Sequence, residues 1–178
     1  GARSWSSEKD TRIAVQDRFG GDRGTVDLDA DTLADAMMAA RILGYAQGFR
    51  ILRAASDLYD WSLDYARVAE IWRAGCIIRS ALLDDISEAF RSDLPHGDLI
   101  LSPVFSDRLI GCLPALRKTV AGAVAAGHPV PVLAGSLQFM DSMRQGAGTA
   151  NVIQAQRDFF GHHGFERLDA EGKQLGPW

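Results

Sequence analysis

Apolar residues form two helical stripes between residues 32 and 59. One stripe has steps of four, three, four and three, and it contains Met38, Ile42, Tyr45, Phe49 and Leu52. The other contains Leu33, Ala36, Met37 and Ala40. Two stripes at this spacing indicate a helix that packs on more than one side. The pattern predicts a long helix from about Thr32 to Tyr59, with Thr32 as its N-terminal cap and Asp35 as the partner of that cap.

The rest of the chain repeats the helical pattern in shorter segments. Asp60-Trp61-Ser62 interrupts it, and Ser62 or Asp64 is suited to cap the next helix. Helical segments are expected at about residues 68–90, 107–127, 132–143 and 151–160, the second despite Pro114 and the last ended by Gly161. The polar tail to Trp178 is expected to be extended, and no alternating run predicts a strand. The sequence therefore predicts an all-α fold, with residues 1–178 as a single helical domain.

Composition narrows the classes of partner, site and location. The formal net charge is −4, which gives no reason to expect a nucleic-acid partner. The sequence contains no signal peptide and no apolar run long enough to cross a bilayer, so we expect a cytoplasmic protein without a membrane partner. Cys76 and Cys112 lie outside any CxxC and indicate reduced core thiols. The pair His162-His163 has no third ligand at a suitable spacing, so no metal site is expected.

Three motifs occur in an order and spacing typical of one enzyme family. Tyr45-Ala46-Gln47-Gly48-Phe49 lies on the long helix, Ile71–Arg79 follows it, and Ile153–Gly161 reads Ile-Gln-Ala-Gln-Arg-Asp-Phe-Phe-Gly. In these motifs the chain resembles the decarboxylating 6-phosphogluconate dehydrogenases, and specifically their all-helical C-terminal portion. The resemblance covers essentially the whole chain. Ala74 departs from the family pattern, which has glycine at that position.

The resemblance implies a reaction for which this stretch of sequence supplies only some of the parts. In the family, hydride leaves C3 of 6-phosphogluconate for NADP, carbon dioxide is lost, and an enediol is protonated to ribulose 5-phosphate. These 178 residues contain no strand–GxGxxG–helix unit, and the family's catalytic lysine and glutamate lie on a helix upstream of this segment. We therefore expect no catalytic residue, no cofactor bound by this chain and no dehydrogenase activity from it alone. NADP is expected for the complete family enzyme.

The part that the resemblance assigns to this chain belongs to a phosphate clamp. Arg157 matches the family arginine that reaches into the partner subunit's site and binds the substrate phosphate, a role that suits a permanently charged fork. His163 matches the family histidine beside it, although His162 leaves the register open by one residue. Arg3 matches a further substrate-binding arginine. The resemblance thus implies a homodimer and a phosphosugar or another small anionic ligand.

Structural roles compete with these functional ones. For Arg157 the alternative is a surface ion pair with Asp158 or Glu166. Arg73 and Arg79 are expected to form structural salt bridges. For the chain as a whole, one alternative is a stand-alone protein that derives from the family and binds a small molecule or catalyses a cofactor-free reaction. Another is a subunit of a split enzyme, so the sequence leaves open whether this chain is itself an enzyme.

Overall fold

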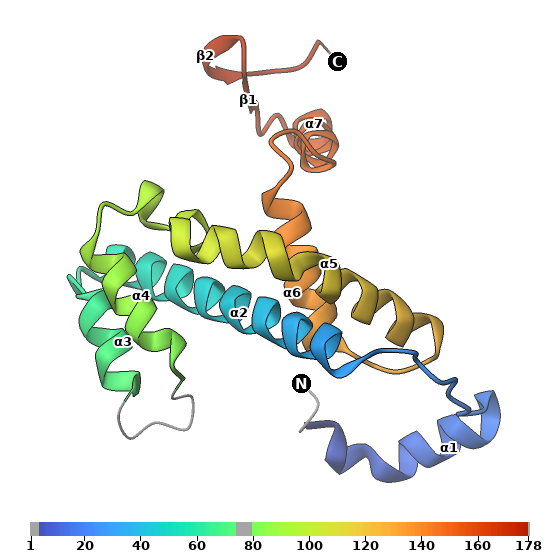
Figure 1. Ribbon diagram of the computed structural model, residues 1–178. Helices are drawn as coiled ribbons and strands as arrows, with labels where there is room; N and C mark the ends of the chain where they lie inside the picture. The colour runs from blue at the N-terminus through green and yellow to red at the C-terminus, as the bar shows by residue number, and fades with distance from the viewer. Residues whose placement is uncertain (1–3, 74–79, 178) are drawn as a thin grey trace. The chain divides into compact units, whose positions relative to one another are not determined.

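The structure, a computed structural model, describes residues 4–73 and 80–177. These residues are mainly helical, which confirms the all-α prediction (Figure 1). Contacts divide the chain into two compact units, Gly1–Leu137 and Gln138–Trp178. The elements in chain order are η1 (Ser4–Glu8), α1 (Lys9–Phe19), α2 (Ala30–Tyr59), α3 (Tyr65–Arg73), α4 (Leu82–Arg91), η2 (Pro95–Gly97), η3 (Leu99–Leu101), α5 (Pro103–Ala125), α6 (Pro131–Met143), α7 (Ala150–Gly161), β1 (Phe165–Arg167) and β2 (Ala170–Gln174).

The long helix α2 is capped by Asp29. Its Oδ1 accepts a hydrogen bond from the backbone N–H of Thr32 at 2.6 Å, and its Oδ2 accepts one from Oγ1 of Thr32 at 2.9 Å. These two bonds lower the pKa of the Asp29 carboxyl. The prediction of Thr32 as the cap is wrong, because Asp29 has the extended backbone of a cap residue and Thr32 already lies in the first turn. The helix ends at Tyr59, as predicted.

The break after α2 depends on left-handed backbone conformations. Asp60 has a φ of 54° and Ser62 a φ of 51°. Oδ1 of Asp64 then accepts a hydrogen bond from the backbone N–H of Arg67 at 3.0 Å. Of the two predicted caps for the next helix, Asp64 is therefore the one that takes this role.

The core of the first unit lies where α2 and α5 run side by side (Figure 1). The helix pair α3 and α4 adds aromatic contacts to α2. The ring of Phe49 lies 5.2 Å from that of Trp72 and 4.8 Å from that of Phe90, measured between centroids. The largest fully buried apolar side chains come from α2, α4 and α5, and they are Leu43, Leu83, Ile86, Phe105, Leu109 and Leu116. The long helix is thus packed on more than one side, as its two stripes predict.

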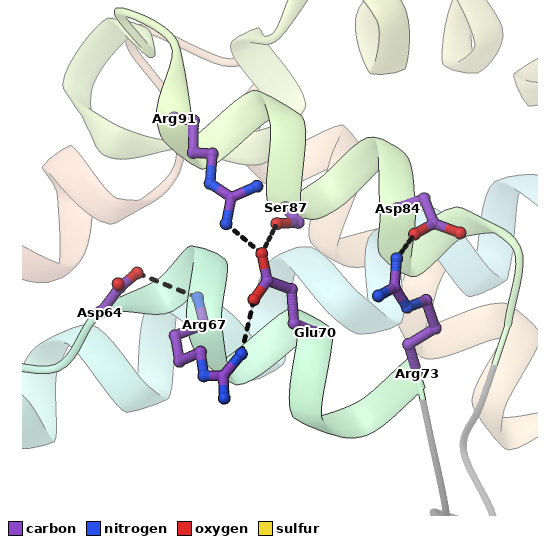
Figure 2. A network of polar contacts seen from close by, with 7 residues as sticks. All are labelled: Asp64, Arg67, Glu70, Arg73, Asp84, Ser87 and Arg91. Carbon is purple, nitrogen blue, oxygen red and sulfur yellow. Dashed lines mark hydrogen bonds and ion pairs between the residues drawn. The ribbon is translucent and has the colours of Figure 1, made fainter.

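A network of polar contacts joins α3 to α4 (Figure 2). Glu70 accepts hydrogen bonds from Arg67 at 3.0 Å, from Ser87 at 3.2 Å and from Arg91. The hydrogen bond from Arg67 is the main reason that the pKa of the Glu70 carboxyl is lowered. The network therefore fixes the two helices through one carboxylate that is charged at neutral pH.

The neighbouring carboxylates Asp84 and Asp85 serve different partners. Asp84 pairs with Arg73 of α3, and Asp85 pairs with Arg108 of α5 at 2.5 Å. The prediction of a structural salt bridge is therefore confirmed for Arg73. Arg79, for which the same was predicted, lies outside the described residues.

The second unit carries a strand pair that the sequence pattern does not predict. β1 pairs antiparallel with β2, so that Glu166 lies opposite Lys173 and Phe165 opposite Gln174. The tail is extended as expected, but the expectation that it contains no strand is wrong. Nearly every position of both strands is exposed, so their sequence shows no alternation of apolar and polar residues.

Candidate functional site

A buried carboxylate organises the second unit. Asp158, near the end of α7, is 0% exposed. Its Oδ1 accepts a hydrogen bond from the backbone N–H of Gly164, and its Oδ2 accepts one from that of Gly176, both at 2.7 Å. The two glycines flank the hairpin, so one side chain fixes both hairpin ends to α7. Burial also excludes Asp158 as a surface ion-pair partner of Arg157, and backbone donors satisfy its carboxylate instead.

The turn after α7 brings the chain back over the end of the helix. His162 adopts a left-handed conformation, with a φ of 47°, at the C-cap position. Gly161, the predicted terminator, is therefore the last residue of the helix itself. A Cβ added at Gly161 would lie 2.8 Å from Nε2 of His163. The imidazole of His163 thus fills the space that a larger residue at position 161 would need.

Arg157 and His163, two of the three predicted binding residues, line the same groove. We call it the Arg157 groove; it has a volume of about 810 Å³ and lies within the second unit. His163 lines it, and His162 is not among its lining residues. The exposed guanidinium of Arg157 donates a hydrogen bond of 3.3 Å to Oε1 of Gln154. Among the described residues, this bond leaves the rest of the fork for an anion.

The charge of the Arg157 groove is unevenly distributed. Arg167 forms a two-pronged pair with Asp169, at 2.7 Å and 2.6 Å. Their hydrogen bonds raise the pKa of the Arg167 guanidinium and lower that of the Asp169 carboxyl, so these two charges serve each other. Lys173 also lines the groove. The sequence analysis missed this lysine, because only the unpredicted hairpin brings it back toward α7.

The third predicted binding residue is not placed. Arg3 lies outside the described residues.

Among residues 4–73 and 80–177, no three His, Cys, Asp or Glu side chains gather as metal ligands would. No helix in that part of the chain combines the length and the apolar character that a membrane crossing needs.

The glycine-rich segments do not fit a dinucleotide cofactor such as NADP. A dinucleotide phosphate is normally held where a strand passes through a glycine-rich turn into a helix. Gly146 and Gly148 precede α7, but the element before them is the helix α6. Gly20 and Gly21 likewise follow the helix α1. Neither segment therefore has the geometry that binds the pyrophosphate.

A larger groove lies in the first unit on the exposed face of α2. Its volume is about 1010 Å³, and Gly44, Gly48, Tyr45 and Trp72 are among its lining residues. A Cβ added at either glycine would meet nothing within 4 Å, so the groove is open above them. An ion pair at its rim, Arg108–Asp85, is internally neutral, and Arg41 also lines the groove. The α2 groove thus sets one arginine among mainly apolar residues, whereas the Arg157 groove gathers Arg157, His163 and Lys173 and is the better candidate for an anion.

The whole chain matches one known protein family. Residues 1–178 match the family described as "6-phosphogluconate dehydrogenase, C-terminal domain". The chain belongs to the 6-phosphogluconate dehydrogenase family. The resemblance drawn from the three sequence motifs is thereby confirmed, and so is the helical fold expected from it.

Individual 6-phosphogluconate dehydrogenases show how much of such a protein this chain represents. The decarboxylating enzyme of Shigella flexneri is 41% identical over 181 residues, which cover 99% of this chain and 39% of that protein. The NAD(+)-dependent decarboxylating enzyme of Bacillus subtilis is 39% identical over 182 residues, again 99% of this chain and 39% of that protein.

A solved 6-phosphogluconate dehydrogenase has the same fold over this region. The structure from Plasmodium falciparum has a TM-score of 0.87 at 32% identity, and the match covers 99% of this chain and 39% of that one. It is described in its apo form, with its cofactor NADP+ and with its substrate 6-phosphogluconate. The chain thus spans about two fifths of the length of these relatives.

Proposed function

We propose that this chain supplies the phosphate-binding and subunit-pairing portion of a 6-phosphogluconate dehydrogenase. The observation that carries the proposal is the convergence of Arg157 and His163 on one groove, within and beside a motif typical of the family. The Plasmodium falciparum relative is described with 6-phosphogluconate as its substrate, which suggests the phosphate of that sugar acid as the ligand. The chemistry of dehydrogenation is left to residues that these 178 do not include.

Arg157, His163 and the buried Asp158 have distinct parts in this proposal. The guanidinium of Arg157 donates two parallel hydrogen bonds to phosphate oxygens, which fixes both the position and the orientation of the phosphate. His163 donates a further hydrogen bond from its ring N–H to the phosphate. Asp158 holds the hairpin so that both groups stay on the same groove. The chain therefore binds and orients the ligand and transfers no proton or hydride.

Calorimetric titration with 6-phosphogluconate tests the phosphate site. One arginine and one histidine in open solvent should give a dissociation constant on the order of millimolar. Arg157→Ala should weaken binding about tenfold or more, as expected for the loss of a charge-assisted pair. Arg18→Ala removes another exposed arginine, from α1, and serves as the matched control. Unchanged binding by Arg157→Ala, with an unchanged helical circular dichroism signal, would contradict the proposed site.

The apolar surface of the second unit supports the proposed pairing of subunits. Phe160 is 75% exposed, and the other exposed apolar side chains of this unit include Val152, Ile153, Phe159 and Leu175. Within residues 138–177 only Asp158 and Gly164 are buried, so the described part of this unit has no apolar core of its own. A second copy of the chain that covers these side chains would supply the missing burial.

Light scattering tests the pairing directly. We expect about twice the 19.3 kDa of one chain. Phe160→Asp should shift the protein toward the monomer, whereas Phe19→Asp on α1, at another strongly exposed phenylalanine, should not. A wild-type chain that stays monomeric at high micromolar concentration would contradict the proposed homodimer.

A further inference from the structure

The side chain of Lys173 packs against Gly164. Lys173 lies on β2 and shares the Arg157 groove with Arg157 and His163. Gly164 has a φ of 69°, and a Cβ added there would lie 2.7 Å from Cε and 2.8 Å from Cγ of Lys173. The aliphatic stem of Lys173 therefore lies directly over Gly164, the residue that follows His163 and donates to Asp158.

Lys173 differs from the other hairpin cation in its partners. Arg167 is already paired with Asp169 through two hydrogen bonds. Glu166 lies opposite Lys173 in the strand register, but no ion pair joins Lys173 to a carboxylate in the described part of the chain. Among the described residues, the ammonium of Lys173 thus brings a positive charge without a salt-bridge partner to a groove that Glu166 also lines.

We propose that Lys173 is a further anion-binding residue of the Arg157 groove and contacts the same phosphate that Arg157 binds. The proposal rests on the proposed function of that groove. A guanidinium presents a rigid fork, whereas an ammonium on a flexible stem is a compact charge with three rotatable donors. The two groups therefore complement each other on a phosphate dianion: Arg157 orients it, and Lys173 neutralises its second charge.

Two substitutions separate the charge of Lys173 from the packing of its stem. Lys173→Met keeps an unbranched stem over Gly164 and removes the charge, whereas Lys173→Arg keeps both. Lys173→Met should weaken the binding of 6-phosphogluconate about threefold, the size expected of one exposed ionic contact, and should reduce its dependence on salt. Lys173→Arg should bind as the wild type does. Lys9→Met, which removes an exposed lysine from α1, is the control and should change neither quantity.

The outcomes distinguish this proposal from the one on which it rests. Equal affinity of wild type, Lys173→Met and Lys173→Arg, with Arg157→Ala still weakened, would overturn the role of Lys173 and leave the phosphate site in place. Equal weakening of Lys173→Met and Lys173→Arg would also overturn it, because the loss would then follow from packing. No loss in any variant, Arg157→Ala included, would overturn both proposals together.

Discussion

Different interactions stabilise the interior of each of the two units. In the first, apolar side chains such as Leu43, Leu83 and Phe105 are completely or almost completely buried between helices. In the second, the fully buried side chain is the carboxylate of Asp158, and directed hydrogen bonds take the place of a core. Burial of apolar area tolerates small shifts, whereas hydrogen bonds fix particular atoms. The first unit is thus suited to be a scaffold, and the second to hold a few polar groups in position.

The grooves of the two units differ in the same way. Apolar residues and glycines make up most of the α2 groove; of its two arginines, Arg108 is paired with Asp85 and Arg41 is the other. The Arg157 groove presents Arg157 and Lys173 without a paired carboxylate among the described residues. We therefore expect the Arg157 groove to be the better suited to a phosphosugar, although it is the smaller of the two.

The largest expected effect is the loss of a core side chain from the first unit. Leu43 is 0% exposed, so Leu43→Ala should lower the free energy of unfolding by about 2–5 kcal/mol. Leu168, on the hairpin turn of the second unit, is 98% exposed, and Leu168→Ala should change it by less than about 0.5 kcal/mol. Urea unfolding followed by circular dichroism measures both. Comparable losses in the two variants would mean that the units do not differ in this way.

A smaller, local effect is expected from Asp158→Asn. Asparagine keeps one acceptor oxygen and turns an amide donor toward the other backbone N–H, so one of the two hydrogen bonds is lost. The cost should be about 1–3 kcal/mol and confined to the second unit. Amide exchange at Gly164 and Gly176 should quicken, while exchange in α2 and α5 stays as it was.

Asp169→Asn is the matched control for that exchange experiment. Asp169 lies on the same hairpin but is exposed and pairs with Arg167. Its removal should leave the exchange of both glycine amides unchanged. Unaltered exchange at both Gly164 and Gly176 in Asp158→Asn would show that the carboxylate does not anchor the hairpin.

The smallest expected effect is the pH dependence contributed by Glu70. The hydrogen bond from Arg67 and the charge of Arg91 lower its pKa in the folded chain below the ordinary 4.5. Its stabilising contribution is therefore complete above that ordinary value and is lost as the pH falls through the lowered one. Glu70→Gln should flatten the acid limb of a plot of urea midpoint against pH. Glu88→Gln, on the same helix pair, should leave that limb as steep as in the wild type.

The contrast between the units also explains what could be predicted from the sequence. Stripes of apolar residues such as Ile42 and Phe49 predict the long helix, because its stability comes from burial that is visible in the pattern. The cap at Asp29 was missed because the choice between Asp29 and Thr32 depends on backbone angles that the pattern does not contain. The hairpin was missed because its strands are exposed and are held by the distant carboxylate of Asp158.

The residues of the candidate site also differ in whether the sequence predicts them. Arg157 and His163 could be predicted because they belong to, or directly follow, a motif that the family shares. Lys173 could not, since its place in the groove depends on the turn between β1 and β2 and on the absence of a side chain at Gly164. A residue that joins a site through an unpredicted turn carries no mark in the sequence.

Chemical-shift mapping with 6-phosphogluconate shows which of the two units binds the phosphosugar. Backbone amide signals are followed as the ligand is added to the isotopically labelled chain. We expect the signals of His163, Gly164 and Gly176 to shift in a saturable way, and Arg157→Ala to remove these shifts. We also expect the signals of Gly44 and Gly48 of the α2 groove to stay in place. Saturable shifts at Gly44 and Gly48, with the second unit unaffected, would contradict the account.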